Sequence, residues 1–253
     1  MCSGALVQLT RFRESVQRCR AAIVHTCTME RMHMTKVVAV TINKGGAGKT
    51  MISRSLATAA AEAGLSVLIL DMDTQQNSTN WRKRRPETIA LPLVQFTTEN
   101  DLEETLARAR TAERDLVIID TPPGRSSEAP AAVEVADLVL IPCPPEVEAF
   151  EGLPRTARLA RTTGKTAVVV PNFVQPNSRS EEEAIRGVAE AQGLATVPVA
   201  LHRFNVHRDG SLRGLTAQEL QRDSRAAAEI GLLWDWLRSE LQLTTIAIVH
   251  KVA

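Results

Sequence analysis

The seven residues from Lys44 to Thr50 (KGGAGKT) have the composition of a loop that binds phosphate groups. Glycines allow the backbone to turn its N–H groups toward phosphate oxygens. The Lys49 ammonium can reach the β- and γ-phosphates of a nucleotide, and the Thr50 hydroxyl can ligate Mg²⁺. We therefore interpret the segment as a P-loop. The residues predicted to contact the nucleotide here are Gly45, Gly46, Ala47, Gly48, Lys49, Thr50 and Met51.

The loop departs from the common pattern G-x-x-x-x-G-K-[ST] at its first position, where this chain has Asn43. A second lysine, Lys44, follows at once. A lysine at the start of the loop does not lie over the phosphates that its own loop binds. Its ammonium can instead reach a phosphate bound elsewhere, such as in a partner subunit.

Two carboxylates follow the apolar run over 66–70. Asp71 and Asp73 would lie at the carboxyl end of a parallel strand, where open α/β sheets bind ligands. Asp73 can orient or activate an attacking water, and Asp71 can support Mg²⁺ or the loop. A polar turn that merely ends a strand is the alternative, and the preceding P-loop makes the chemical interpretation the better one.

A third carboxylate ends the apolar run over 115–119. Asp120 is followed by Thr121, Pro122, Pro123 and Gly124, which form a stiff turn. An apolar strand that ends in one aspartate is a Walker B arrangement, so we expect Asp120 to hold Mg²⁺ through a water. The Gly124 N–H in this turn could sense the γ-phosphate.

The elements that must position these residues alternate along the chain. Apolar, β-prone runs cover 36–42, 66–70, 92–96, 115–119, 137–142, 166–170 and 197–201. Helical stretches are predicted over 48–63, 100–112, 147–162, 180–192 and 223–241. Strands that are apolar on both faces and alternate with helices indicate a parallel sheet covered on both sides. The expected fold is an α/β, three-layer P-loop NTPase sandwich with a mostly parallel, twisted sheet.

Composition narrows the functional classes. The 253 residues carry 30 basic and 29 acidic side chains, so the net charge is +1 and a basic coat is excluded. With 5 Phe, 3 Trp and no Tyr, stacking platforms for single strands are scarce. Cys143 is the only cysteine after residue 33, and no CxxC pair occurs, which argues against a disulfide framework or a zinc site.

We expect three segments. Residues 1–33 form an N-terminal extension, interpreted as a disordered tail or the product of an upstream start site; a docking helix and a targeting segment are the alternatives. Residues 34–241 form the ATPase domain. Residues 242–253 form an apolar, β-prone tail that we assign to no element.

The sequence KGGAGKT resembles the deviant Walker A motif of the ParA/MinD class of P-loop ATPases, and the resemblance covers about 34–240. It implies ATP and Mg²⁺ as cofactors. It also implies that Lys44 crosses the interface of an ATP-bound dimer, and that Asp73 takes part in hydrolysis. The family's D-x-D-P-Q segment has Thr74 here in place of proline. The resemblance further implies that Asn172 contacts adenine.

The resemblance is strongest to small plasmid-type ParA partition proteins. It implies a cytoplasmic ATPase that forms an ATP-dependent homodimer, binds duplex DNA without sequence preference and associates with the nucleoid. Slow hydrolysis would be stimulated by a ParB-like protein at a centromere-like site. Arginine groups are the candidate DNA contacts: the run 81–86, Arg155, Arg158 and Arg161, and the residues Arg203, Arg208, Arg213, Arg222 and Arg225.

Three alternatives remain open. A MinD-like membrane or protein-positioning ATPase needs a C-terminal amphipathic helix, and the tail has one Lys and no helical charge stripe; membrane binding is therefore not favoured. A cluster-binding protein would have one core cysteine per subunit, Cys143, where family members use two. A binding-only scaffold conflicts with the intact Lys49, Asp73 and Asp120.

Overall fold

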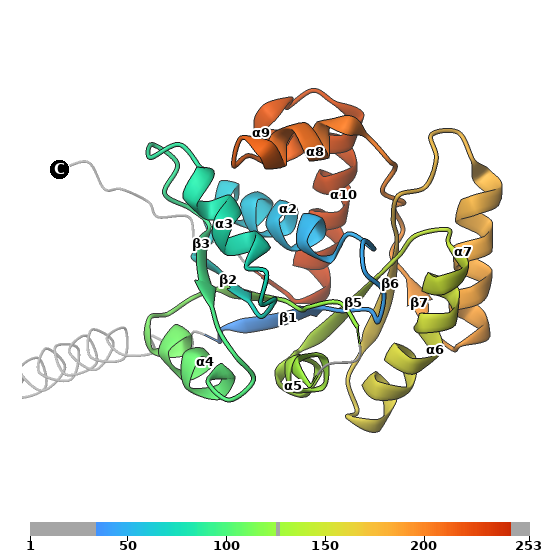
Figure 1. The fold of residues 1–253 in the computed structure, drawn as a ribbon, viewed down its shortest axis with the longest axis horizontal. Helices are drawn as coiled ribbons and strands as arrows, with labels where there is room; N and C mark the ends of the chain where they lie inside the picture. Colours follow the sequence, from blue (N-terminus) through green and yellow to red (C-terminus); the bar gives the residue numbers. More distant parts are fainter. Residues whose placement is uncertain (1–33, 125–126, 244–253) are drawn as a thin grey trace, which may run out of the picture. The chain divides into compact units, whose positions relative to one another are not determined.

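The structure is a computed structural model that describes residues 34–124 and 127–243 (Figure 1). Its centre is a seven-stranded sheet with the order β3-β2-β4-β1-β5-β6-β7. All the pairings between these strands are parallel, as the sequence predicts. The strands are β1 (Lys36–Val40), β2 (Val67–Asp71), β3 (Leu93–Phe96), β4 (Leu116–Asp120), β5 (Leu138–Cys143), β6 (Ala167–Pro171) and β7 (Ala195–Thr196).

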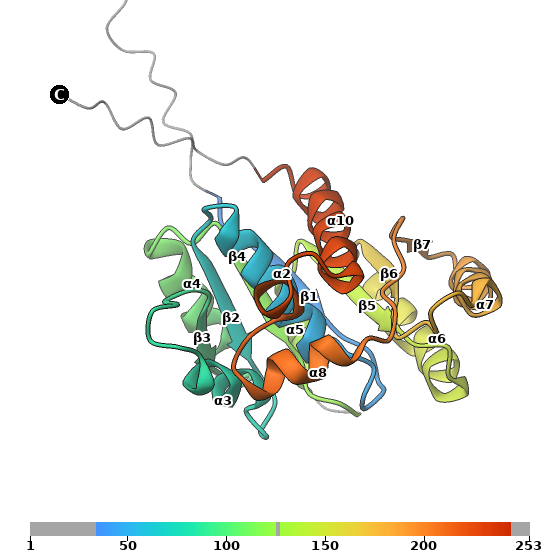
Figure 2. The same cartoon turned by 90° about the horizontal axis from the view of Figure 1, so that it is seen from above.

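Helices cover both faces of the sheet, which confirms the expected three layers (Figures 1 and 2). One face carries α2 (Lys49–Glu62), α3 (Asn77–Arg84), α8 (Asn205–Leu212), α9 (Ala217–Leu220) and α10 (Arg225–Glu240). The other face carries α4 (Leu102–Thr111), α5 (Glu128–Val135), α6 (Val147–Thr162) and α7 (Arg179–Ala191).

Alternate residues of each central strand face different cores. In β1, Val38 and Val40 pack in the cluster that contains the buried side chains of α2 and α10. Val37 and Ala39 belong to the opposite cluster, with α4 to α7. Because successive side chains of a strand point to opposite faces, a strand buried on both sides must be apolar at every position. This is why the runs of the sequence predict the central strands so well.

The prediction of a strand over 197–201 is wrong. The seventh strand is the two-residue β7, Ala195–Thr196, and Pro198 follows it closely. Proline has no N–H to donate to a ladder. The backbone nevertheless stays close to β6, since the Val197 N–H donates to Val169 and the Leu201 N–H donates to Pro171, at 2.9 and 2.8 Å. Both edge strands, β3 and β7, are therefore short.

The long predicted helices are present as α2, α4, α6, α7 and α10, with bounds shifted by at most two residues. Four shorter helices, α3, α5, α8 and α9, were not predicted. Residues 1–33 and 244–253 lie outside the described residues, and with them the expectations for the extension and for most of the tail. No helix in 34–124 or 127–243 is both long enough and apolar enough to cross a membrane.

Candidate nucleotide-binding site

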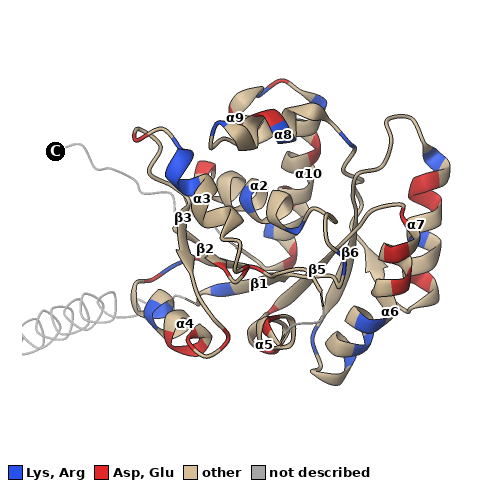
Figure 3. Ribbon diagram, viewed as in Figure 1, with Lys and Arg blue, Asp and Glu red and all other residues tan. Residues whose placement is uncertain are grey.

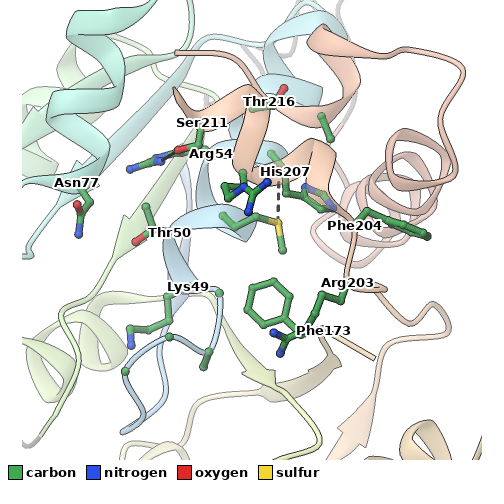
Figure 4. Close-up of a pocket in the computed structure, with 18 of the residues that line it drawn as sticks. Lys49, Thr50, Arg54, Asn77, Phe173, Arg203, Phe204, His207, Ser211 and Thr216 are labelled. Carbon is green, nitrogen blue, oxygen red and sulfur yellow. Dashed lines mark hydrogen bonds between the residues drawn. The ribbon is translucent and has the colours of Figure 1, made fainter. Parts of the chain in front are cut away.

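A cavity of about 740 Å³ opens at the carboxyl ends of the strands. The P-loop and the start of α2 form one wall, and the segment after β6 together with α8 and α9 forms the other (Figure 4). All the P-loop residues from Gly45 to Met51 line it, and Asp73 and Thr121 join them from the ends of β2 and β4. The volume and the wall of glycines fit a nucleotide.

The backbone of the P-loop requires glycine at Gly48. This residue precedes α2 with φ = 92°, in the left-handed region. A Cβ at this position would lie 2.1 Å from Asn172 Nδ2 and 3.1 Å from Phe173 Cζ. Gly46 also has a positive φ, of 75°, but a Cβ there would meet nothing within 4 Å. There is thus no room for a side chain at Gly48, whereas the space beside Gly46, where phosphates would bind, is free.

Lys49 is almost fully buried at the start of α2. Its ammonium donates to the Lys44 carbonyl at 2.9 Å and to the Ile42 carbonyl at 3.3 Å. Burial lowers the pKa of Lys49, while the negative charges of Asp120 and Asp73 act in the opposite direction. A cation that is held by neutral carbonyl groups at the end of the loop can exchange them for phosphate oxygens.

Thr50 and Asp120 form the predicted metal-binding pair. The Thr50 hydroxyl donates to Asp120 Oδ1 at 3.2 Å, and the Ser78 hydroxyl donates to Asp120 Oδ2 at 2.8 Å. Burial raises the pKa of Asp120 to about 6, against the lowering effect of the Ser78 hydrogen bond. A hydroxyl and a carboxylate at this spacing offer the hard oxygen donors that Mg²⁺ prefers, so these residues fit a magnesium ion.

Asp71 and Asp73 have separate surroundings. Asp71 is completely buried, and its Oδ2 accepts from the Thr79 backbone N–H at 2.8 Å and from the Thr79 hydroxyl at 2.9 Å. It therefore holds the first turn of α3, and a direct role at the metal stays a prediction. Asp73 lines the cavity, and its Oδ1 accepts from the Gln75 N–H at 2.9 Å. Its role in hydrolysis also stays a prediction.

Lys44 lies outside this cavity. Its ammonium lies 3.1 Å from Glu146 and 3.6 Å from Glu148, at the start of α6. The hydrogen bond to Glu146 raises the pKa of Lys44. The two lysines of the loop thus point in different directions, one into the phosphate site and the other away from it.

Asn172 is buried after β6 and does not line the cavity. Its amide nitrogen donates to the Ala47 carbonyl at 2.7 Å, and its Oδ1 has no hydrogen-bond partner. In this structure the side chain therefore supports the P-loop from behind. The contact with adenine stays a prediction.

Arg54 is a site residue that the sequence reasoning missed. It lies one helical turn after Thr50, lines the cavity and is mostly buried. Its guanidinium donates to the Ser78 hydroxyl at 3.3 Å and to the Ser211 hydroxyl at 3.0 Å. Because Ser78 also donates to Asp120, Arg54 links the metal pair to α8. A lone arginine in an alanine-rich helix was the signal that could have identified it.

Trp81 and Arg85 brace α3 against the segment after α8. The Arg85 guanidinium stacks over the Trp81 ring at 4.5 Å, and Arg54 lies at 5.4 Å from the same ring centroid. Arg85 forms a buried ion pair with Glu219, with 3.0 Å between Nη1 and Oε2. A Cβ at Gly214 would lie 2.4 Å from the Arg84 backbone, so only glycine fits this approach.

Cys143 is completely buried in β5, and burial raises the pKa of its thiol to about 12. An inaccessible thiol of this kind is a structural residue, not a metal ligand. Within residues 34–124 and 127–243, no group of three or more His, Cys, Asp or Glu side chains is placed to hold a metal ion.

This strand, glycine loop and helix, with Thr50 and Asp120 facing each other, define a P-loop nucleotide-binding protein. The chain belongs to the family of the CobQ/CobB/MinD/ParA nucleotide binding domain, whose model matches residues 38–206. It is a P-loop ATPase of the ParA/MinD class, for which ATP and Mg²⁺ are the cofactors.

The names of individual similar proteins refer to different processes. The chain is 31% identical over 204 residues to the maintenance of carboxysome distribution protein A of Gloeobacter kilaueensis, covering 77% of this chain and 93% of that protein. It is 30% identical to an iron-sulfur cluster carrier protein of Mycobacterium bovis, over 55% of this chain and 45% of that protein. The fold matches that of the septum site-determining protein MinD complexed with Mg-ADP from Pyrococcus horikoshii, with a TM-score of 0.66 and 18% identity, over 84% of this chain and 100% of that chain.

Proposed function

We propose that this chain is a ParA-type partition ATPase. It binds Mg-ATP, forms a nucleotide-sandwich homodimer, binds duplex DNA without sequence preference and hydrolyses ATP slowly to segregate a plasmid or chromosome. The observation that carries the proposal is the placement of Lys44, whose ammonium lies outside its own cavity and against Glu146. A lysine that is part of the loop but cannot serve its own nucleotide is suited to the nucleotide of a second copy.

Different residues of the chain have separate roles in the proposed hydrolysis. Loop N–H groups and Lys49 bind the phosphates, and Thr50 and Asp120 would hold Mg²⁺. The metal ion, when bound, would neutralise charge that develops on the phosphates. Asp73 lines the cavity, where its carboxylate would orient the attacking water by accepting a hydrogen bond from it.

Two of the arginine groups that lie far apart in the sequence meet on one surface. The Arg84 guanidinium donates to the Ser211 carbonyl at 3.3 Å, which joins the end of α3 to the end of α8. We call the exposed residues Lys83, Arg84 and Arg213 the α3–α8 basic surface. Phosphate-backbone contacts need such clustered, exposed charges and no reading helix. We propose this surface as the DNA contact.

The remaining group, the arginines of α6, lies elsewhere on the protein and provides a control. Arg155, Arg158 and Arg161 are exposed on α6, on the opposite face of the sheet from α3 (Figure 3). They carry the same number of positive charges as the α3–α8 basic surface. Removing either set changes the net charge of the protein equally, so any difference between the two variants reports position.

The test is duplex-DNA binding over a salt series with ATP or ADP. The Asp73→Ala protein, expected to retain the ATP dimer, provides a stable sample. We expect binding with ATP only, with a steep salt dependence. The triple variant Lys83→Ala, Arg84→Ala, Arg213→Ala should weaken binding and reduce the slope of log K against log salt by about 0.9 for each phosphate that the protein no longer neutralises. The triple α6 variant should bind like the parent.

Wild-type protein that shows no ATP-dependent DNA binding would contradict the partition function. Equal effects of the two triple variants would contradict only the assignment of the α3–α8 basic surface as the DNA contact.

Because one relative is named for carboxysome distribution, a protein assembly is the alternative cargo. A ParB-like protein at a centromere-like site is the stimulator that we propose, and the active state is a dimer on the nucleoid in the cytoplasm. The MinD-like alternative depends on the tail, which lies mostly outside the described residues.

A further inference from the structure

Arg54 is a mostly buried cation in the wall of the nucleotide cavity, and its guanidinium donates to neutral groups (Figure 4). Its Nε donates to the Ser78 hydroxyl at 3.3 Å, and its Nη1 donates to the Ser211 hydroxyl at 3.0 Å. Burial lowers the pKa of Arg54 to about 10, so the side chain stays charged at neutral pH. Because a buried charge is costly unless it is well compensated, its presence here indicates a role other than packing.

Ser78 connects this cation to the predicted metal-binding pair. It is completely buried, and its hydroxyl donates to Asp120 Oδ2 at 2.8 Å. A serine hydroxyl has a single proton. Because the Arg54 N–H points its own proton at the serine oxygen, the proton of Ser78 is left for the carboxylate. Asp120 Oδ2 is thereby held in place, and Oδ1 faces the Thr50 hydroxyl at 3.2 Å, where Mg²⁺ would bind.

Ser211 holds the same guanidinium from the opposite wall of the cavity, because it lies in α8 whereas Arg54 lies in α2. A guanidinium presents its N–H groups in a rigid fork, so the two serines together fix both its place and its plane. The Trp81 ring, with its centroid 5.4 Å from the guanidinium carbon, restricts it further. The position of Arg54, and through Ser78 that of the metal-binding carboxylate, therefore depends on where α8 lies.

We propose that Arg54 is a positioning residue for Mg²⁺ binding, which acts on Asp120 through Ser78. Its bond to Ser211 makes metal binding depend on the place of α8. Hydrogen bonds carry this effect, because the positive charge of Arg54 by itself would repel the metal ion. Since coupling between two sites is reciprocal, bound Mg²⁺ should in turn hold α8 in place. The inference rests on the proposed magnesium site at Thr50 and Asp120 and is independent of DNA binding.

The experiment measures the dissociation constant of ADP in EDTA and over a series of Mg²⁺ concentrations, since ADP avoids the proposed ATP-dependent dimer. Ser78→Ala should raise the half-saturating Mg²⁺ concentration about tenfold, as expected for a hydrogen-bond partner of a metal ligand. Ser211→Ala should raise it about threefold, because its bond lies one step further from the metal. Both variants keep the charge of Arg54. Neither should change ADP binding in EDTA by more than about twofold.

Two further variants and a second readout separate this role from general bracing. Ser211→Thr retains a hydroxyl and should restore the wild-type Mg²⁺ dependence. Ser239→Ala removes an exposed hydroxyl on α10 and should bind Mg²⁺ and ADP like the wild type. In the ADP complex, Mg²⁺ should slow amide hydrogen exchange in α8 of the wild type, and it should do so less in Ser211→Ala.

A Ser211→Ala protein with the wild-type Mg²⁺ dependence, or with the wild-type protection of α8 by Mg²⁺, would overturn the proposal. So would serine variants that weaken ADP binding equally in EDTA and in Mg²⁺, because a bracing role alone would produce that result. An Asp120→Ala protein that keeps the wild-type response to Mg²⁺ would contradict the magnesium site itself, and with it the role of Arg54. Thermal unfolding in EDTA identifies a variant that fails to fold; if Ser78→Ala does, the comparison of Ser211→Ala with Ser211→Thr decides the question.

Discussion

The Lys44 ammonium and the Glu146 carboxylate lie 3.1 Å apart, at the boundary between the P-loop and α6. This pair directs Lys44 away from the cavity that Lys49 serves. If Lys44 acts on the nucleotide of a second copy, Lys44→Ala should abolish ATP-dependent dimerisation and turnover while the monomer still binds ATP. Light scattering with ATP, together with a nucleotide-binding assay, measures the two properties separately.

Lys49→Ala is the matched control for that experiment, since it removes the same charge five residues further along the loop. It should abolish ATP binding itself, because the Lys49 ammonium lies at the phosphate end of the cavity. A Lys44→Ala protein that dimerises like the wild type would show that the cross-subunit role is wrong.

Gly48→Ala should damage both stability and nucleotide binding. The added methyl would meet Asn172 Nδ2 at 2.1 Å, in a backbone conformation that alanine rarely adopts. We expect a loss of more than about 1 kcal/mol of unfolding free energy. Gly187→Ala is the control, because a Cβ at that helical position meets nothing within 4 Å. It should stabilise the protein by about 0.5–1 kcal/mol. Urea unfolding of both variants checks the prediction, and equal unfolding free energies for Gly48→Ala and Gly187→Ala would refute it.

The raised pKa of Asp120 predicts a pH dependence of stability in the nucleotide-free, metal-free protein. The folded-state pKa of about 6 exceeds the ordinary value of 3.8, so the folded state binds the proton more tightly. The stability that Asp120 contributes should therefore fall as the pH rises from about 4 to about 6, and then level off. Asp120→Asn should be more stable than the wild type at pH 7, and the difference should shrink as the pH falls toward 4. A difference that stays constant with pH would argue against this.

Arg85 and Glu219 provide a test of the brace between α3 and α9. The Arg85 side chain is completely buried, so Arg85→Met leaves Glu219 as an unpaired charge. We expect a loss of about 3–5 kcal/mol of unfolding free energy. The double variant Arg85→Met, Glu219→Leu should recover part of it. Arg108→Met removes one member of the exposed pair with Glu104 and should cost no more than about 0.5 kcal/mol. Chemical denaturation measures all three.

The parts of the site that could be predicted are those that depend on local sequence. The P-loop, Asp73 and Asp120 each follow an apolar strand directly, and parallel strands bring their carboxyl ends together. β2 and β4 place Asp71 and Asp120 in register, so the group of carboxylates follows from the topology alone.

Residues that reach the site across long sequence distances could not be predicted. Ser211 meets Arg54 across 157 positions, and His207 enters the cavity on a short helix without a strong apolar pattern. The cationic run at 81–86 suggested an exposed surface, yet Trp81 and Arg85 are buried. Only the packing of α3 against the segment after α8 distinguishes Arg85 from its exposed neighbour Arg84.

The short edge strands of the sheet bear on how copies of this chain can meet. A long, exposed edge is a template for uncontrolled strand pairing and aggregation between molecules. Here β7 has two residues and β3 has four, with Pro92 just before β3 and Pro198 shortly after β7. Neither edge offers a long row of free backbone groups. The proposed ATP-dependent dimer would then form through the surface around the P-loop, where a bound nucleotide can regulate it reversibly.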